Sequence, residues 1–265
     1  MHSSVPLGEG MNRMKRLLAA LLAALLVTAP LLARADDEEA QIGRQVYDQL
    51  NGQGKIVTDS PYYKVLDPIA RRVAAIADPQ YQYPFHFILV KDKQPNAFAV
   101  PGGNVYVTVP LMTFVKNQEE LAGVLCHETS HDIHHDVMHR INVDRNLSIG
   151  AQLLGAILHV NQLGAQAINL AANLQDLHFS RGVEQNADHL GAYTCAKAGY
   201  NPWGMVWLME RFQSADRSSA PEFLSDHPSD QARIGALRQE FANNPSVFAR
   251  WSSSLSQAAH PLPSP

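Results

Sequence analysis

The sequence predicts an α+β fold, a mostly helical domain with a small β-sheet beside one central helix. Three observations predict it. Apolar residues recur at helical spacing in the longest patterned segments, whereas β-branched and aromatic residues gather in short runs between residues 85 and 109. The string His127-Glu128-Thr129-Ser130-His131 lies inside one of the helical segments. About 230 residues follow an N-terminal leader, enough for one domain with a substantial core.

The leader has the features of a secretory signal peptide. Lys15 and Arg16 precede an unbroken apolar run over residues 17–27, and Ala33-Arg34-Ala35 precedes an acidic stretch. The apolar run is too short to favour a membrane span. We therefore expect a signal peptide over residues 1–35, cleavage after Ala35, and a periplasmic mature chain without a transmembrane helix.

The charge of the mature chain argues against nucleic acid as a partner. Cleavage removes one acid and four basic residues, so the formal net charge moves from −4 to −7. We expect a single domain over residues 36–250. The segment 251–265 is rich in Ser and Pro and is expected to be a disordered tail.

Two helices and three strands are predicted before the central helix. The helices cover residues 38–50 and 61–77, where apolar residues have helical spacing. Strands are expected over 85–90 and 104–109, separated by turn-forming Pro and Gly residues. A further short strand would contain Ala97, Phe98 and Ala99, either beside the cleft or as a plain core strand.

The central helix is predicted from Gln118 to Arg140. His127 and His131 are four residues apart, so their imidazoles lie on one face of this helix and can bind the same Zn²⁺ ion. Glu128 lies beside them, where it can act as a base. Cys126 points about 100° away from His127 on the helix and is not counted as a ligand. Cys126 and Cys195 are interpreted as small core residues, with a disulfide as the alternative.

A zinc ion needs a third protein ligand, and a carboxylate pair downstream can supply it. Glu184 and Asp188 are also four residues apart, so they share one helical face. Glu184 is the candidate third ligand, and Asp188 can accept a hydrogen bond from a ligand histidine. The alternative is a solvated acidic face.

These motifs resemble a known family. H-E-x-x-H followed by Ser180-Arg181-x-x-Glu184-x-x-x-Asp188 is similar to the zinc metallopeptidases that include the HtpX heat-shock protease and the CAAX prenyl protease (Ste24-like), in the soluble periplasmic branch. Two further strings agree, one over residues 96–107 and one over 226–234 that contains His227-Pro228. The four blocks lie within residues 38–240, and their joint presence in this order is more specific than any one of them.

The resemblance implies a zincin-like metallopeptidase domain of the gluzincin type with one Zn²⁺ per chain. Glu128 would be the catalytic base. His227 would either stabilise the oxyanion or cover the metal at rest, unless it is an ordinary loop histidine. Arg181 would pair with a carboxylate, such as Asp188, or lie at the surface. The strand over Ala97, Phe98 and Ala99 would hydrogen-bond an extended peptide substrate.

The segment 141–178 is rich in Leu, Ala and Ile but is interrupted by many polar residues, so it is not a transmembrane helix. We interpret it as a helical hairpin or one long helix that lies over the site or makes a peripheral membrane contact. Residues 192–212 are predicted to form a helix, a turn and a second helix.

Two functions remain open from the sequence. The first is a periplasmic zinc metalloendopeptidase that hydrolyses unfolded or misfolded proteins, a quality-control role implied by the resemblance. The second is a zinc-containing, chaperone-like binding protein with little turnover, gated by His227. Glu128 distinguishes them, because a binding protein does not require a base beside the metal.

Overall fold

The computed structural model describes residues 38–146, 178–214, 227 and 231–265. The chain forms two compact units, Met1–Gln41 and Ile42–Pro265, and every element that builds the site belongs to the second. The predicted signal peptide and the part of the segment 141–178 between residues 147 and 177 lie outside the described residues. Within the described ranges, no helix combines the length and the apolar character needed to cross a bilayer.

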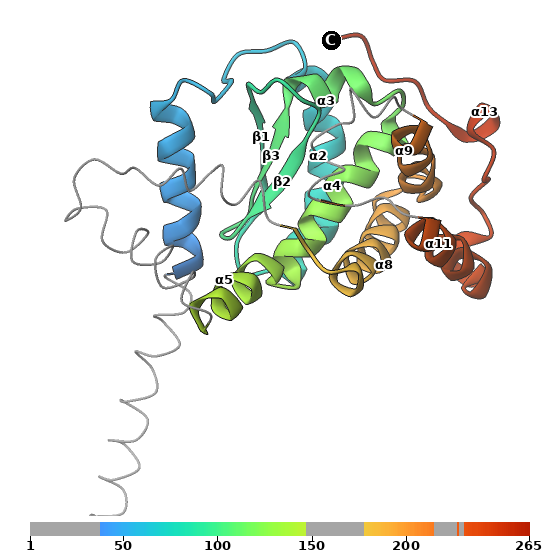
Figure 1. The fold of residues 1–265 in the computed structure, drawn as a ribbon. Helices are drawn as coiled ribbons and strands as arrows, with labels where there is room; N and C mark the ends of the chain where they lie inside the picture. The colour runs from blue at the N-terminus through green and yellow to red at the C-terminus, as the bar shows by residue number, and fades with distance from the viewer. Residues whose placement is uncertain (1–37, 147–177, 215–226, 228–230) are drawn as a thin grey trace, which may run out of the picture. The chain divides into compact units, whose positions relative to one another are not determined.

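A three-stranded sheet lies beside the helices (Figure 1). Its strands are β1 (His86–Val90), β2 (Ala97–Val100) and β3 (Asn104–Thr108), in the order β1-β3-β2. β3 is parallel to β1 and antiparallel to β2. The turn between β2 and β3 requires glycine at 103, where φ is +89° and a Cβ would lie 2.4 Å from the Pro84 carbonyl oxygen. The predicted strands are thus confirmed within one residue, and β2 is an edge strand.

The two faces of the sheet are covered by different helices. Ala97 and Ala99 share a core cluster with residues of α2 (Tyr63–Ala77) and α4 (Gln118–Ile133). Phe98 and Val100 face the other side, because successive side chains of a strand alternate. There they pack with the helical residues Ile42, Val46 and Leu50 and with α5 (Asp136–Asn146). Short helical segments, η1 (Asp78–Gln80) and α3 (Val109–Phe114), connect these elements.

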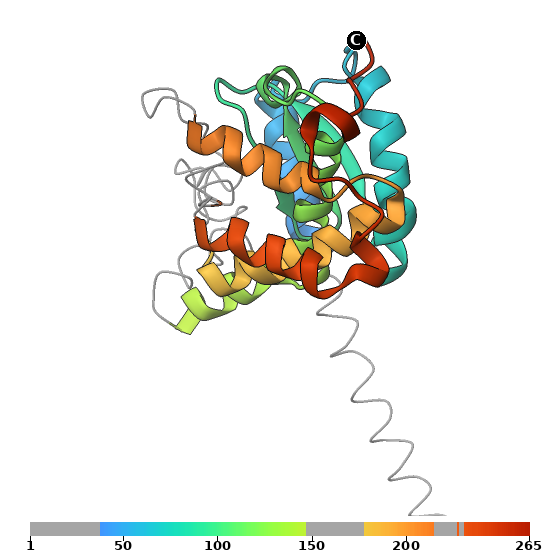
Figure 2. The same cartoon turned by 90° about the vertical axis from the view of Figure 1, so that its right-hand side faces the viewer.

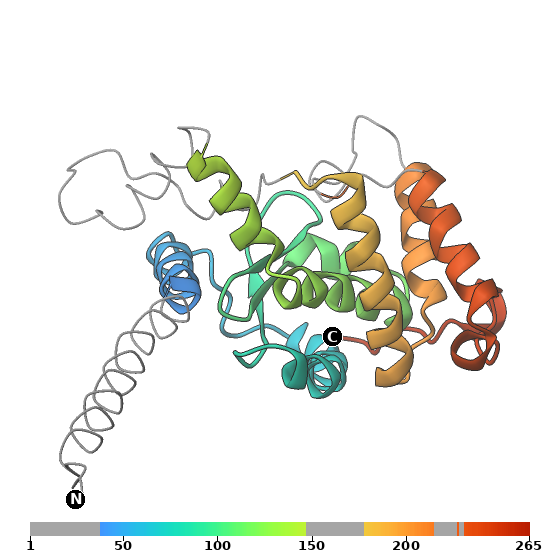
Figure 3. The ribbon, with the colours of Figure 1, turned by 90° about the horizontal axis from the view of Figure 1, so that it is seen from below.

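Helix α4 is buried along almost its whole length. All its residues from Glu119 to Asp132 are buried, with the sheet and α2 on one side and α8 (Arg181–Ala198) and α9 (Trp203–Ser214) on the other (Figure 3). Cys126 and Cys195 are free thiols buried in the same core cluster, which confirms their interpretation as small core residues.

The predicted helix from Gln118 to Arg140 is wrong at its end. α4 ends at Ile133, His135 adopts the left-handed region with φ +54°, and α5 starts in a new direction at Asp136. Helical spacing continues on both sides of the break, and no glycine or proline marks it, so periodicity alone could not detect it.

The C-terminal segment also differs from the prediction. After α11 (Gln231–Asn243) and α12 (Pro245–Phe248), residues 252–262 run along the domain, with a short helix α13 (Leu255–Ala258) (Figure 2). The carbonyls of Ser252 and Ser253 accept hydrogen bonds from Asn201 and Trp207. Further along, Pro261 forms a β-bridge with Asn117. The expected disordered tail is instead ordered against α9 and the start of α4, and we call residues 252–262 the C-terminal strap.

Candidate metal centre

The two histidines of α4 meet at their Nε2 atoms. His127 and His131 are buried, and their Nε2 atoms are 3.1 Å apart. Their rings are nearly perpendicular, at 89°, with centroids 4.7 Å apart. The four-residue spacing therefore brings both nitrogens to one point on the helix face, as the sequence predicted.

Helix α8 brings Glu184 to the same point. The Ser180 hydroxyl caps this helix by accepting from the Val183 N–H, so Glu184 lies in its first turn. Its Oε2 is 3.4 Å from His127 Nε2, and its Oε1 is 3.8 Å from His131 Nε2. The close approach of α8 to α4 depends on Gly191, where a Cβ would lie 3.3 Å from the backbone of Cys126 and His127. Glycine at 191 thus leaves room for the backbone of α4 beside α8.

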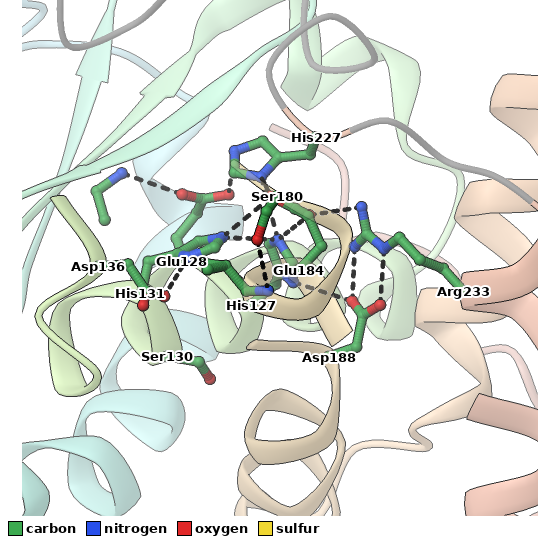
Figure 4. A network of polar contacts seen from close by, with 12 residues as sticks. His127, Glu128, Ser130, His131, Asp136, Ser180, Glu184, Asp188, His227 and Arg233 are labelled. Atoms are coloured by element: carbon green, nitrogen blue, oxygen red, sulfur yellow. Dashed lines mark hydrogen bonds and ion pairs between the residues drawn. The ribbon is translucent and has the colours of Figure 1, made fainter. Parts of the chain in front are cut away.

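His227 supplies a fourth donor from the segment before α11. Its Nδ1 is 3.3 Å from His127 Nε2 and 2.9 Å from Glu184 Oε1. Its Nε2 is 3.6 Å from Glu128 Oε1. The ring is buried and lies between the base and the other donors (Figure 4).

The four donors fit a tetrahedral zinc ion. Ligand atoms of His127, His131, Glu184 and His227 all lie within 4.8 Å of one another. Bonds of 2.0–2.1 Å in a tetrahedron place neighbouring ligand atoms about 3.3–3.4 Å apart, and five of the six donor pairs here are separated by 2.9 to 3.8 Å. Imidazole nitrogens and a carboxylate are the ligands that zinc takes in proteins, so the donor set suits this ion. Within the described residues no other group of His, Cys, Asp and Glu forms such a cluster.

Each α4 histidine is held on its outer side by a carboxylate. Asp188 Oδ1 is 3.1 Å from His127 Nδ1, and Asp136 Oδ2 is 2.8 Å from His131 Nδ1. Acceptors at Nδ1 favour the tautomer whose Nε2 lone pair points to the centre. Asp188 lies where the sequence predicted it, whereas Asp136 was missed because the break after α4 could not be foreseen.

Arg233 is the second residue that the sequence reading missed. Its guanidinium makes two hydrogen bonds of 2.7 Å to Asp188 and lies 2.6 Å from Glu184 Oε2. The expected partner, Arg181, is exposed at the start of α8. Exposure of Arg181 fits the alternative of a surface arginine, and pairing of Arg181 with a carboxylate stays a prediction. The only signal was that Arg233 lies in the same string as His227.

Glu128 is held by the edge strand. Its Oε2 accepts a hydrogen bond of 3.0 Å from the backbone N–H of Ala99 on β2. Ala97 and Ala99 are on the α4 side of the sheet, whereas the Phe98 ring stacks on Tyr106 on the opposite side, with centroids 5.1 Å apart. The Phe98 side chain is therefore part of the core. Any contact of this strand with a substrate would involve the backbone of Ala97 and Ala99.

The electrostatics of the centre favour a cation. Burial opposes ionisation of Glu184 and Asp188, yet His227 and His127 lower the pKa of Glu184, and Arg233 lowers that of Asp188. Burial also opposes a charged His127, but hydrogen bonds to Asp188 and Glu184 raise its pKa to about 10. Burial lowers the pKa of His227 to about 4, although Glu184 opposes the shift. Without a metal, the ionised carboxylates thus hold a proton on His127.

Comparison with known families agrees with this geometry. The model of peptidase family M48 matches residues 64–241, which include His127, His131, Glu184 and His227. The chain belongs to peptidase family M48. Members of family M48 are zinc-dependent metallopeptidases, which accords with one zinc ion at the four-donor cluster. The resemblance to the HtpX and CAAX prenyl proteases indicated this same family, and the mostly helical α+β fold agrees with it.

Curated relatives of this M48 chain are longer proteins. The beta-barrel assembly-enhancing protease of Yersinia pestis is 27% identical over 256 residues, covering 84% of this chain and 52% of the relative. That of Escherichia coli K12 is 28% identical, with the same coverage. The mitochondrial metalloendopeptidase OMA1 of Schizosaccharomyces pombe is 28% identical over 77% of this chain and 61% of its own length. The chain thus spans about half the length of the first two.

Proposed function

We propose that this protein is a periplasmic zinc metalloendopeptidase that hydrolyses unfolded or misfolded envelope proteins. The observation that carries the proposal is a carboxylate, Glu128, beside four converging metal donors and hydrogen-bonded to an edge strand. A metal-binding protein needs the donors but not the adjacent base. Family membership and the metalloendopeptidases among the relatives support the same reaction.

Zinc, when bound by His127, His131 and Glu184, would polarise a substrate carbonyl and lower the pKa of water. Glu128 accepts the proton of the attacking water and passes it to the leaving nitrogen. The Ala99 N–H fixes Oε2 and so aims the carboxylate. In this mechanism His127, His131 and Glu184 would bind the ion, and Glu128 transfers the proton.

The edge strand β2 would align the substrate. The Asn96 carbonyl accepts from Thr108 N–H in β3, so alternation directs the backbone groups of Ala97 and Ala99 away from β3. The Ala97 N–H donates to Asn96 Oδ1 and the Ala99 N–H to Glu128 Oε2. An extended peptide would therefore pair with this edge by donating to the carbonyls of Ala97 and Ala99, and it would lie beside Glu128. Because backbone groups make these bonds, the pairing suits unfolded chains of varied sequence.

His227 would control access. Its Nδ1 lies 2.9 Å from Glu184 Oε1 and 3.3 Å from His127 Nε2, which supports a position for this ring on the path of a substrate or water to the donors. We propose that this arrangement is a resting state and that His227 moves aside when substrate binds. The same observation favours the second function, a zinc-containing chaperone-like protein with little turnover.

The decisive experiment replaces Glu128 by Gln and measures zinc content and cleavage of unfolded casein. We expect one zinc per chain and a rate at least about 100-fold lower, because the variant lacks the base. Glu210→Gln, at an exposed position on α9, is the matched control and should retain full activity. A Glu128→Gln protein with zinc and the wild-type rate would refute the mechanism. Wild-type protein that binds zinc but cleaves no unfolded substrate would support the binding function.

Export through cleavage after Ala35 would be supported by N-terminal sequencing of protein from the periplasm that begins at Asp36. The envelope substrates are proposed because two relatives are beta-barrel assembly-enhancing proteases. Peripheral membrane contact through residues 141–178 stays a prediction.

A further inference from the structure

The break between α4 and α5 brings Asp136 to a ligand histidine. In an unbroken α-helix, five residues advance about 500°, so position 136 would point about 140° away from His131. Here Asp136 Oδ2 is 2.8 Å from His131 Nδ1. The contact therefore exists only because the helix ends between the two residues.

The break between α4 and α5 lies at His135, whose backbone conformation is unfavourable for a residue other than glycine. His135 has φ +54°, a region that costs residues other than glycine roughly 1 kcal/mol or more. Its N–H bonds to the Asp132 carbonyl at 2.9 Å, which closes α4, and its ring lies against Tyr81. Among described non-glycine residues, His135 is the one with positive φ. Strain of this kind persists where the surrounding structure requires the turn.

The ring of His131 is fixed from two sides. The side chain of Asp136 is only 11% exposed and that of His131 is 1% exposed, so their hydrogen bond is shielded from water. Phe179, just before α8, stacks on the imidazole at 4.5 Å with an interplanar angle of 15°. An acceptor at Nδ1 leaves the Nε2 lone pair directed at the cluster.

We propose that Asp136 is a positioning residue for the metal centre and that the left-handed turn at His135 serves to deliver it to His131. The inference deepens the proposed function, since it assumes that the four-donor cluster binds zinc. Asp188 has the corresponding role for His127, but it comes from α8 and is shared with Arg233. Asp136 acts on His131 alone among the described ligands.

The test measures zinc affinity by competition with a chromophoric chelator. We expect Asp136→Ala to weaken zinc binding about 10–100-fold. Asp136→Asn keeps an acceptor oxygen but loses the charge, so it should fall between Ala and wild type. Asp78→Ala is the matched control: Asp78 is a partly buried carboxylate that accepts from the Phe85 N–H away from the centre, and zinc affinity should not change.

Two further measurements separate positioning from general destabilisation. The visible spectrum of Co²⁺-substituted Asp136→Asn should differ from wild type, since the ligand ring is less constrained. His135→Gly should retain wild-type zinc affinity, because glycine adopts the left-handed turn without strain. Wild-type affinity and an unchanged cobalt spectrum in both Asp136 variants would overturn the proposal. Because zinc binding is read directly, that result is distinct from failure of the peptidase function, which would appear as absent casein cleavage.

Discussion

Arg233 is the residue on which the charge balance of the centre depends. It is 1% exposed and contacts both Asp188 and Glu184, carboxylates one turn apart on α8. Its planar guanidinium binds Asp188 through two parallel hydrogen bonds. Without it, two ionised carboxylates would remain buried beside each other in the metal-free protein.

We therefore predict that Arg233→Met lowers the free energy of unfolding of the metal-free protein by about 3–5 kcal/mol at pH 7. Arg233→Lys should restore only part of the loss, since an ammonium cannot bind both oxygens in the same geometry. Urea denaturation followed by circular dichroism measures both. The pKa of Asp188 is lowered in the folded state, so its stabilisation is present above the unfolded pKa and is lost as pH falls through the lower folded value. A loss below about 1 kcal/mol for Arg233→Met would contradict this account.

At the scale of elements, the C-terminal strap forms hydrogen bonds with the start of α4. Glu119 is 2% exposed and accepts a 2.8 Å hydrogen bond from the His260 N–H. Gln118 donates to the His260 carbonyl, and Trp207 of α9 donates to Ser253. The strap thus provides partners for buried polar groups of α4 and α9.

Truncation after Trp251 should consequently destabilise the domain by about 2–4 kcal/mol, because it leaves Glu119 and the Trp207 indole without these partners. Thermal unfolding of residues 36–251 measures the effect. Truncation after Leu262 keeps the strap and serves as the control, with an expected change close to zero. Equal melting temperatures for the two truncated proteins would show that the strap adds no stability.

Composition and periodicity did not predict the order of the C-terminal strap or the break after α4. The Ser/Pro-rich composition of residues 251–265 indicated disorder, but hydrogen bonds to residues far away in the sequence order the strap. Similarly, the break at His135 lacks glycine or proline. The strap and the break both depend on tertiary contacts, which local sequence patterns do not encode.

At the scale of the whole molecule, the metal centre joins three separate parts of the chain. His127 and His131 come from α4, Glu184 comes from α8, and His227 precedes α11. Bound metal would therefore crosslink the second compact unit and stabilise it as a whole.

We predict that removal of zinc by a chelator lowers the melting temperature by roughly 10 °C, reversed by added zinc. The estimate assumes free zinc at about a thousandfold excess over Kd, which contributes about 4 kcal/mol, and 2–4 °C per kcal/mol for a domain of this size. Differential scanning fluorimetry provides the measurement. His131→Ala is the control, since its melting temperature should respond far less to zinc. No shift in the wild type would mean that the four donors do not bind the ion in the folded state.

The sequence by itself predicted the fold class, the sheet, the start of α4 and three of the four converging candidate donors, His127, His131 and Glu184. It could do so because the spacing of His127 and His131, and of Glu184 and Asp188, follows from helix geometry alone. The tertiary structure decided which groups surround those donors. Arg233, Asp136 and the Ala99 N–H reach the centre from α11, from beyond a helix break and from a sheet edge. No local pattern encodes these contacts, because they depend on how separate elements pack.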